Sequence, residues 1–317
     1  MAAHRFSFAF RSHPYLYLSM ILRSAFRFTV LCVALAAVAA SATGCRRQAP
    51  PAPPVATASI QLNHDRSPLG SPLDMTFRFV VASDAHFTED YRVMVHVLDA
   101  DGEMIFAFDH NPAVPTTEWK PGQTVEYART EFVPIYPYVG EASIQLGLYS
   151  MQTQKRLPLS GEDAGQRAYK AARLQLQPQT ENVFIVYKDG FHPSEAAEHN
   201  AAVEWQWTKK DATLAFKNPK KDSLLYLDVD HPGTVFKEAQ QLRVSLGSKP
   251  LETFTLAAGD QTLKKIPLKA ADLGADDMVE LHLAVDKTYV PAQLNVTNNT
   301  DPRELGVRVF HAFVDAR

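Results

Sequence analysis

Two tryptophans, two residues apart, are the side chains in this sequence best suited to binding a flat ligand. Trp205 and Trp207 lie in a segment expected to be a strand, where alternate residues share one face. Indole rings stack on the apolar faces of sugar rings as they do on other flat partners. Large aromatic side chains also supply much of the buried area of a sandwich core, and the core is the favoured interpretation.

Four side chains close to this pair in sequence are of the types that bind zinc: His192, Glu195, Glu198 and His199. Their spacing differs from that of the metalloprotease helix, in which two histidines four residues apart flank the catalytic glutamate. Surface and capping roles are therefore favoured, and no metal is predicted. His192 and Glu195 remain candidates for contact with a ligand.

Arg303, between Asp301 and Glu304, has the planar donor set that can fork onto a carboxylate or onto two sugar hydroxyls. An internal ion pair is the commoner use of such an arginine. Asp228 and Asp230 offer oxygen ligands for calcium at a strand end, where a polar turn is the favoured interpretation.

The motifs of common enzyme classes are missing from the sequence. It has no Gly-x-Ser-x-Gly elbow, no phosphate-binding glycine loop and no zinc-protease helix. The carboxylate pairs of glycosidases leave no spacing signature, so an enzyme that uses Asp189 and Glu195 stays open as the alternative. The sequence predicts no catalytic residue and no cofactor.

The N-terminal region has the pattern of a secretory signal. Arg23 and Arg27 precede an apolar run over residues 28–40, and small residues follow it up to Cys45. This run of about 13 residues is short of the ~20 needed to cross a bilayer as a helix. We therefore expect a signal sequence over residues 1–44, for which Met20 is a better start than Met1.

The four residues Ala-Thr-Gly-Cys at 42–45 resemble the bacterial lipobox, in which the cysteine receives a diacylglyceryl group and becomes the mature N-terminus. Ala42 departs from the leucine usual in that family, and signal cleavage beside an incidental cysteine is the alternative. The resemblance implies a cell-envelope protein anchored to a membrane through lipidated Cys45. Arg46 implies the outer membrane in a Gram-negative host.

The charge balance argues against nucleic acid as a partner. Residues 1–44 carry four arginines and no acidic residue, so their removal changes the net charge from −3 to −7. Cys32 lies in the signal, so Cys45 is the one cysteine left, and an internal disulfide cannot form. Residues 45–56 are rich in proline and predict an extended spacer at ~3.1 Å per residue.

The rest of the chain predicts short strands, because apolar and polar residues alternate with a period of two. Asp99 to Gly102 has the composition of a hairpin turn. One segment, Ser194 to Val203, predicts one or two helical turns capped by Ser194. The strands are expected near residues 73–81, 91–97, 104–108, 124–129, 144–148, 171–176, 225–229, 279–285 and 307–314.

This pattern predicts an all-β protein with two antiparallel β-sandwich domains, immunoglobulin-like or jelly-roll-like, over residues 57–178 and 181–317. In the first, Tyr91–Asp99, Thr117–Gln123 and Leu146–Tyr149 resemble a β-sandwich module of bacterial envelope proteins, also appended to membrane glycosyltransferases of surface-polysaccharide pathways. In the second, Asp189–His192 and Trp205–Thr208 are similar to an accessory β-domain of glycosyltransferases and methyltransferases.

These resemblances imply a setting and transfer no catalytic residue. We expect a lipid-anchored accessory protein of the cell envelope that binds a polysaccharide or another envelope protein. The candidate ligand-binding residues are Trp205, Trp207, Arg303, His192 and Glu195. The alternatives are an enzyme that processes envelope glycans and a structural spacer without a ligand.

Overall fold

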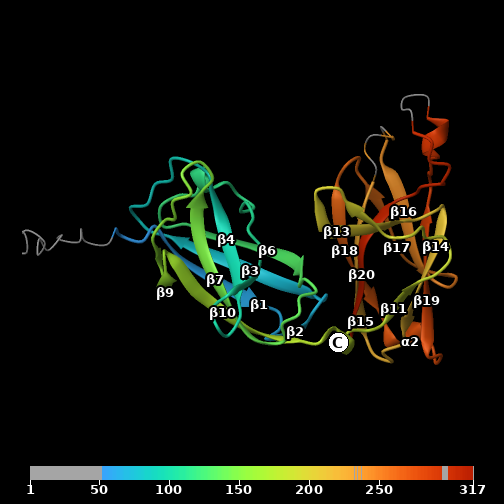
Figure 1. Ribbon diagram of the computed structural model, residues 1–317, viewed down its shortest axis with the longest axis horizontal. Helices are drawn as coiled ribbons and strands as arrows, with labels where there is room; N and C mark the ends of the chain where they lie inside the picture. The colour runs from blue at the N-terminus through green and yellow to red at the C-terminus, as the bar shows by residue number, and fades with distance from the viewer. Residues whose placement is uncertain (1–51, 232, 234, 237, 295–298, 317) are drawn as a thin grey trace, which may run out of the picture. The chain divides into compact units, whose positions relative to one another are not determined.

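The computed structural model describes residues 52–231, 233, 235–236, 238–294 and 299–316 (Figure 1). This part of the chain is built almost wholly of β-strands, which confirms the predicted all-β fold. The segment expected to be a signal sequence, residues 1–44, and Cys45 lie outside the described residues. No helix within those residues is both long and apolar enough to cross a membrane.

The first β-sandwich is made of two sheets whose strands all come from residues 56–177. One sheet has the order β6-β3-β1-β8, with β1 at Ala56–Leu62, β3 at Pro72–Val81, β6 at Thr124–Phe132 and β8 at Leu159–Ser160. The other has the order β2-β10-β7-β4-β5, with β9 paired to β10. Its strands are β2 Arg66–Pro68, β4 Tyr91–Leu98, β5 Met104–Ala107, β7 Gly140–Ser150, β9 Glu162–Gly165 and β10 Ala168–Gln177. All pairs are antiparallel except β1–β8 and β2–β10.

The predicted alternation decides which side chains enter the first core. In β3, every second residue from Leu73 to Phe79 is almost completely buried. Val93, Val95 and Val97 of β4 and Ile144 of β7 belong to the same apolar cluster, so the two sheets pack face to face. Each such side chain contributes about 1.5–3 kcal/mol when it is removed from water. The opposite faces of β4 and β7 carry polar residues such as His96 and Tyr149, together with the buried Met94.

The second β-sandwich is antiparallel throughout. One sheet has the order β11-β14-β19-β16-β17 and the other β12-β13-β20-β15-β18. The strands of the first are Ile185–Tyr187, Asp211–Lys217, Met278–Val285, Gln240–Leu246 and Lys249–Leu256, in that order. Those of the second are Glu195–Ala197, Asn200–Trp207, Arg308–Ala316, Ser223–Asp230 and Gln261–Leu268. The helix α2, Ala270–Leu273, is one turn long, and the 3-10 turns are η1 Thr116–Glu118, η2 Gln179–Glu181 and η3 Pro291–Gln293.

The strands β20 and β15 lie in the middle of the sheet β12-β13-β20-β15-β18. Every residue of β15 is buried, because β20 and β18 flank it and both of its faces are covered. The strand β20, expected from the sequence near residues 307–314, lies between β13 and β15.

The prediction of helical turns from Ser194 to Val203 was wrong. This segment forms β12 and the start of β13, which pair as an antiparallel hairpin around Glu198 and His199. A helix of ten residues is marginal without packing, whereas this segment pairs within the β12–β13 hairpin. Strand pairing therefore outweighs the local helical preference.

Candidate functional site

The five residues predicted to contact a ligand all lie at one edge of the second sandwich, around the β12–β13 hairpin. Glu195 is the register partner of Trp205 across this hairpin. The backbone N–H of His192 donates to the carbonyl of Trp207 at 2.9 Å. Arg303 is linked to the hairpin through Glu195, because the Nη1–H of Arg303 donates to Oε1 of Glu195 at 2.6 Å.

Trp207 and Trp205 belong to a cluster on the outer face of the sheet. Strand register aligns Trp207 of β13, Arg308 of β20 and Asp230 of β15 in one row. The Arg308 guanidinium carbon lies 4.9 Å from the centre of the Trp205 ring, 5.7 Å from that of Trp207 and 5.3 Å from that of Phe310. We call these five residues the tryptophan cluster. It is separate from the apolar cluster between the two sheets.

The charged groups of the tryptophan cluster satisfy each other. Arg308 donates two hydrogen bonds to Asp230, one of them from Nε to Oδ1 at 2.8 Å. Asp230 is 5% exposed and Trp207 is 8% exposed, with the Tyr289 ring against it at 6.1 Å. A planar guanidinium between aromatic rings and paired with a buried carboxylate has the geometry of a structural element.

Arg303 is half-buried, and its guanidinium is likewise paired within the protein. It donates to both carboxylate oxygens of Asp301 and to Glu195, and these interactions, that with Asp301 foremost, raise its pKa further above the ordinary value. The Nε2–H of His192 donates to the carbonyl of Glu304 at 2.7 Å. The pairing of Arg303 with Asp301 and Glu195 is the internal ion pair favoured by the sequence. Glu195, one of the two carboxylates considered for catalysis, is therefore engaged by Arg303.

The structure assigns no metal to these residues. Among the described residues, no three side chains of His, Cys, Asp or Glu are grouped as metal ligands. Asp228, considered for calcium, accepts instead from the amide of Gln261 at 2.7 Å, and Asp230 is bound by Arg308. Both aspartates therefore bind side chains of neighbouring strands in their own sheet.

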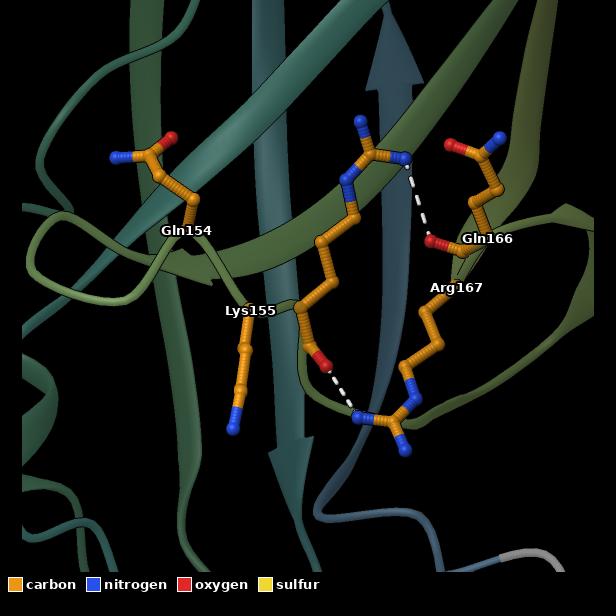
Figure 2. A pocket seen from close by; sticks show the side chains of 5 residues that line it. Gln154, Lys155, Gln166 and Arg167 are labelled. Atoms are coloured by element: carbon orange, nitrogen blue, oxygen red, sulfur yellow. Dashed lines mark hydrogen bonds between the residues drawn. The ribbon is translucent and has the colours of Figure 1, made fainter.

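A cleft of about 400 Å³ lies elsewhere, on the first sandwich, between the loop after β7 and the β9–β10 turn. We call it the arginine cleft; it is lined by Gln154, Lys155, Arg156, Gln166 and Arg167. Figure 2 shows Gln154 and Lys155 on one side and Gln166 and Arg167 on the other. Arg156 donates to the carbonyl of Gln166 at 3.3 Å, and Arg167 donates to the carbonyl of Arg156. Each arginine therefore fixes the opposite loop.

A second cleft of about 200 Å³ adjoins the first, because both are lined by Gln154 and Arg156. We call it the tyrosine cleft; it is completed by Met94, His96, Asp109 and Tyr149. Met94, His96 and Tyr149 come from the outward faces of β4 and β7, opposite the core. The floor of this cleft is therefore the outer face of the six-stranded sheet.

The carboxylate in the tyrosine cleft is held ionised. Burial opposes its charge, but the imidazole of His96, whose Nε2 lies 3.6 Å from Oδ1, and a hydrogen bond from the Val95 N–H at 2.9 Å hold the pKa of Asp109 below its ordinary value. Burial, followed by the charge of Asp109, raises the pKa of Tyr149. Tyr149 thus keeps its hydroxyl as a neutral hydrogen-bonding group.

A glycine lets the β9–β10 turn approach this floor. Gly147 of β7 is the register partner of Met94. A Cβ on Gly147 would lie 3.2 Å from Met94 Cε and 3.3 Å from the carbonyl oxygen of Arg167, both closer than ordinary contacts. A side chain at this position would therefore require Met94 or the Arg167 carbonyl to shift by a few tenths of an ångström.

Sequence reasoning missed both clefts. Their residues come from segments up to about 70 positions apart, residues 94–109 and 149–167, which only strand pairing brings together. The one local signal is the run Gln154-Lys155-Arg156 followed ten residues later by Gln166-Arg167. Such a run is ordinary for an exposed loop and carries no motif.

Comparisons with known proteins reveal β-domains of low similarity. No family model and no curated protein matches the sequence. Among solved structures, the C-terminal domain of Wzt is 12% identical, with a TM-score of 0.30, over 39% of this chain and 75% of that one. The C-terminal CBM6 of the laminarinase LamC from Zobellia galactanivorans is 10% identical, with a TM-score of 0.25, over 42% and 99%.

A third structure contains the CBM51-2 module, in complex with GlcNAc, and INT domains of ZmpB from Clostridium perfringens. It is 10% identical, with a TM-score of 0.24, over 81% of this chain and 41% of that one. The solved structures that align thus include carbohydrate-binding modules. At these values no residue role is transferred from them.

Proposed function

We propose that this protein is a lipid-anchored accessory protein of the cell envelope that binds a polysaccharide across the arginine and tyrosine clefts. The observation that carries the proposal is the pair of adjoining clefts on the outer face of a sheet. Amide, guanidinium, imidazole and phenol groups line them, and these groups form hydrogen bonds with sugar hydroxyls. The two clefts together offer a continuous track to a polymer.

The composition of the track favours binding over cleavage. Glycoside hydrolysis generally needs two carboxyl groups on either side of the scissile bond. Asp109 is the one carboxylate among the residues that line the two clefts, and it is engaged by His96 and the Val95 N–H. A ligand in these clefts would therefore be held without being cut.

The anchor is the second part of the proposal. The signal-like segment and Cys45 support attachment to a membrane through a lipid, and Arg46 supports the outer membrane in a Gram-negative host. The proline-rich residues 45–56 would act as a semi-rigid spacer between that membrane and the first sandwich. A polysaccharide at the cell surface would be within reach of such a module.

Binding of the full-length protein to an array of envelope and plant polysaccharides tests the proposal. We expect Tyr149→Ala to lower the affinity for the bound polysaccharide about tenfold, because it removes a ring face and a hydroxyl. Trp205→Ala, in the tryptophan cluster, is the matched control and should keep the affinity. The opposite result would move the site to the second sandwich. A wild-type protein that binds no polysaccharide would refute the proposed function.

A further inference from the structure

The arginine cleft concentrates cations that have no carboxylate partner. Elsewhere on the first sandwich, Arg78, Arg129 and Arg173 each form an ion pair with a glutamate. Within the described residues, no carboxylate lies within 4.0 Å of the charged nitrogens of Lys155, Arg156 or Arg167. The mature chain is acidic, so this local positive charge is not a consequence of a basic protein.

The two guanidinium groups are oriented but largely unused. The hydrogen bond between Arg156 and the carbonyl of Gln166, and that between Arg167 and the carbonyl of Arg156, each use one of the five N–H donors of a guanidinium. The carbonyl contacts fix the positions of the arginines and leave donors free for a bidentate contact. Such a fork matches the two oxygens of a carboxylate or a phosphate.

The backbone around the cleft adopts a costly conformation. Four non-glycine residues in the described chain have a positive φ, and three of them line this cleft: Gln154 at 57°, Gln166 at 51° and Arg167 at 57°. A left-handed conformation is unfavourable for a non-glycine residue, because it brings the Cβ close to the following carbonyl oxygen. Gln166 and Arg167 form the two-residue turn between β9 and β10, where asparagine and glycine are the preferred residues. The chain instead keeps long polar side chains there, which is typical of a site maintained for its side chains.

We propose that the arginine cleft binds the carboxylate or phosphate group of an acidic sugar, so that the polysaccharide recognised by this protein is anionic. This inference rests on the proposed function and names its ligand class. Arg156 and Arg167 fork onto the anionic group, and Lys155 adds charge at the rim. Gln154 and Arg156 also line the tyrosine cleft, so the bound polymer extends along these two residues to Tyr149.

The test compares acidic with neutral polymers on the full-length protein purified in detergent. The probes are alginate for carboxylate, yeast phosphomannan for phosphate, and laminarin and unphosphorylated mannan as neutral polymers. We expect an acidic polymer to bind at least about tenfold more tightly than either neutral one, since charge-assisted hydrogen bonds are the stronger class. The affinity should fall as NaCl is raised from 50 to 500 mM.

Variants then assign the effect to the cleft. The double variant Arg156→Gln, Arg167→Gln should lose about tenfold or more of the affinity for the acidic polymer and keep the affinity for a neutral one. The control Arg78→Gln, Arg173→Gln removes two arginines that already have glutamate partners, and it should bind as the wild type does. Circular dichroism checks that each variant is folded.

The possible failures are distinguishable. Equal binding of acidic and neutral polymers, unchanged in the double variant, would overturn the anionic ligand and leave the proposed function standing. Binding of none of the four polymers would contradict both. Binding of the Cys45→Ser protein to phosphatidylglycerol vesicles, lost in the double variant, with no binding to any polysaccharide, would show that the cleft recognises lipid phosphate, and it would overturn both in favour of a membrane contact.

Discussion

Arg308 shows how a single residue can decide the stability of the second sandwich. We expect Arg308→Ala to lower the free energy of unfolding by about 3–5 kcal/mol, because it leaves the carboxylate of Asp230 buried without its partner. The variant also loses contacts with three aromatic rings. Urea denaturation, followed by tryptophan fluorescence, measures the change.

Arg303→Ala is the matched control within the same sandwich. Its partners are more exposed, at 33% for the side chain of Glu195 and 22% for that of Asp301, so water can solvate them after the change. We expect a loss of about 1 kcal/mol or less. Equal losses in the two variants would show that the aromatic surroundings of Arg308 add nothing.

A buried histidine gives the first sandwich a dependence on pH. His110 is 5% exposed; its Nδ1–H donates to the carbonyl of Phe108 at 2.9 Å, so Nε2 accepts from the Tyr127 hydroxyl at 2.8 Å. Burial lowers the pKa of His110 from 6.5 to about 4. Between pH 6.5 and 4, His110 is therefore protonated in the unfolded chain and neutral in the folded chain.

Stability should accordingly fall by about 3 kcal/mol as the pH is lowered from 7 to 4, and this contribution should be fully present only above pH 6.5. The variant His110→Phe cannot bind the proton and should be the less pH-dependent of the two. Urea midpoints at pH 7, 5.5 and 4 measure both profiles. Parallel profiles for the two proteins would refute the role of His110.

At the scale of elements, the alternation of apolar residues was enough to predict most strands. The segments 73–81, 91–97 and 279–285 are strands within one or two residues of the predicted limits. Their periodicity reflects one buried face, which is a property of each segment alone. The end of β13 pairs with β20, about 100 residues later, and the residues of β13 alone could not reveal that partner.

The same distinction explains what could be predicted of the sites. The pattern Trp205-Gln206-Trp207 correctly placed both rings on one face, but it could not show that Arg308 covers that face. The two clefts depend on the register of β4, β7 and β10 and on which arginines lack a carboxylate. Neither property is encoded by spacing along the chain.

Gly190 tests how tightly the loop before β12 packs against β14. Its φ is +81°, and a Cβ would lie 2.0 Å from the carbonyl oxygen of Asp211. Gly259 has a φ of +82° with no atom within 4 Å of its Cβ position, so it is the matched control. Both alanine variants suffer the backbone penalty of roughly 1–2 kcal/mol, and only Gly190→Ala must also move a backbone.

We therefore expect Gly190→Ala to be at least about 2 kcal/mol less stable than Gly259→Ala in urea denaturation. If the two variants unfold at the same urea concentration, the loop moves freely and its close packing is not a constraint.

For the whole molecule, the proposed lipid anchor predicts where the protein is found. Cys45→Ser removes the thiol to which a diacylglyceryl group would be attached. We expect the wild-type protein in the membrane fraction, with a fatty-acylated N-terminal peptide by mass spectrometry, and the variant in the soluble fraction. An unmodified Cys45 in the native protein would contradict the anchor. The control is Cys32→Ser, within the expected signal, which should still be acylated.

The position of β20 sets the order in which the second sandwich can be completed. Residues 308–316 follow every other strand of their sheet in the sequence, yet they lie between β13 and β15. Until these residues are synthesised, the sheet consists of two halves that share no backbone hydrogen bonds. A chain that is still being synthesised therefore cannot close this sheet until residues 308–316 are available.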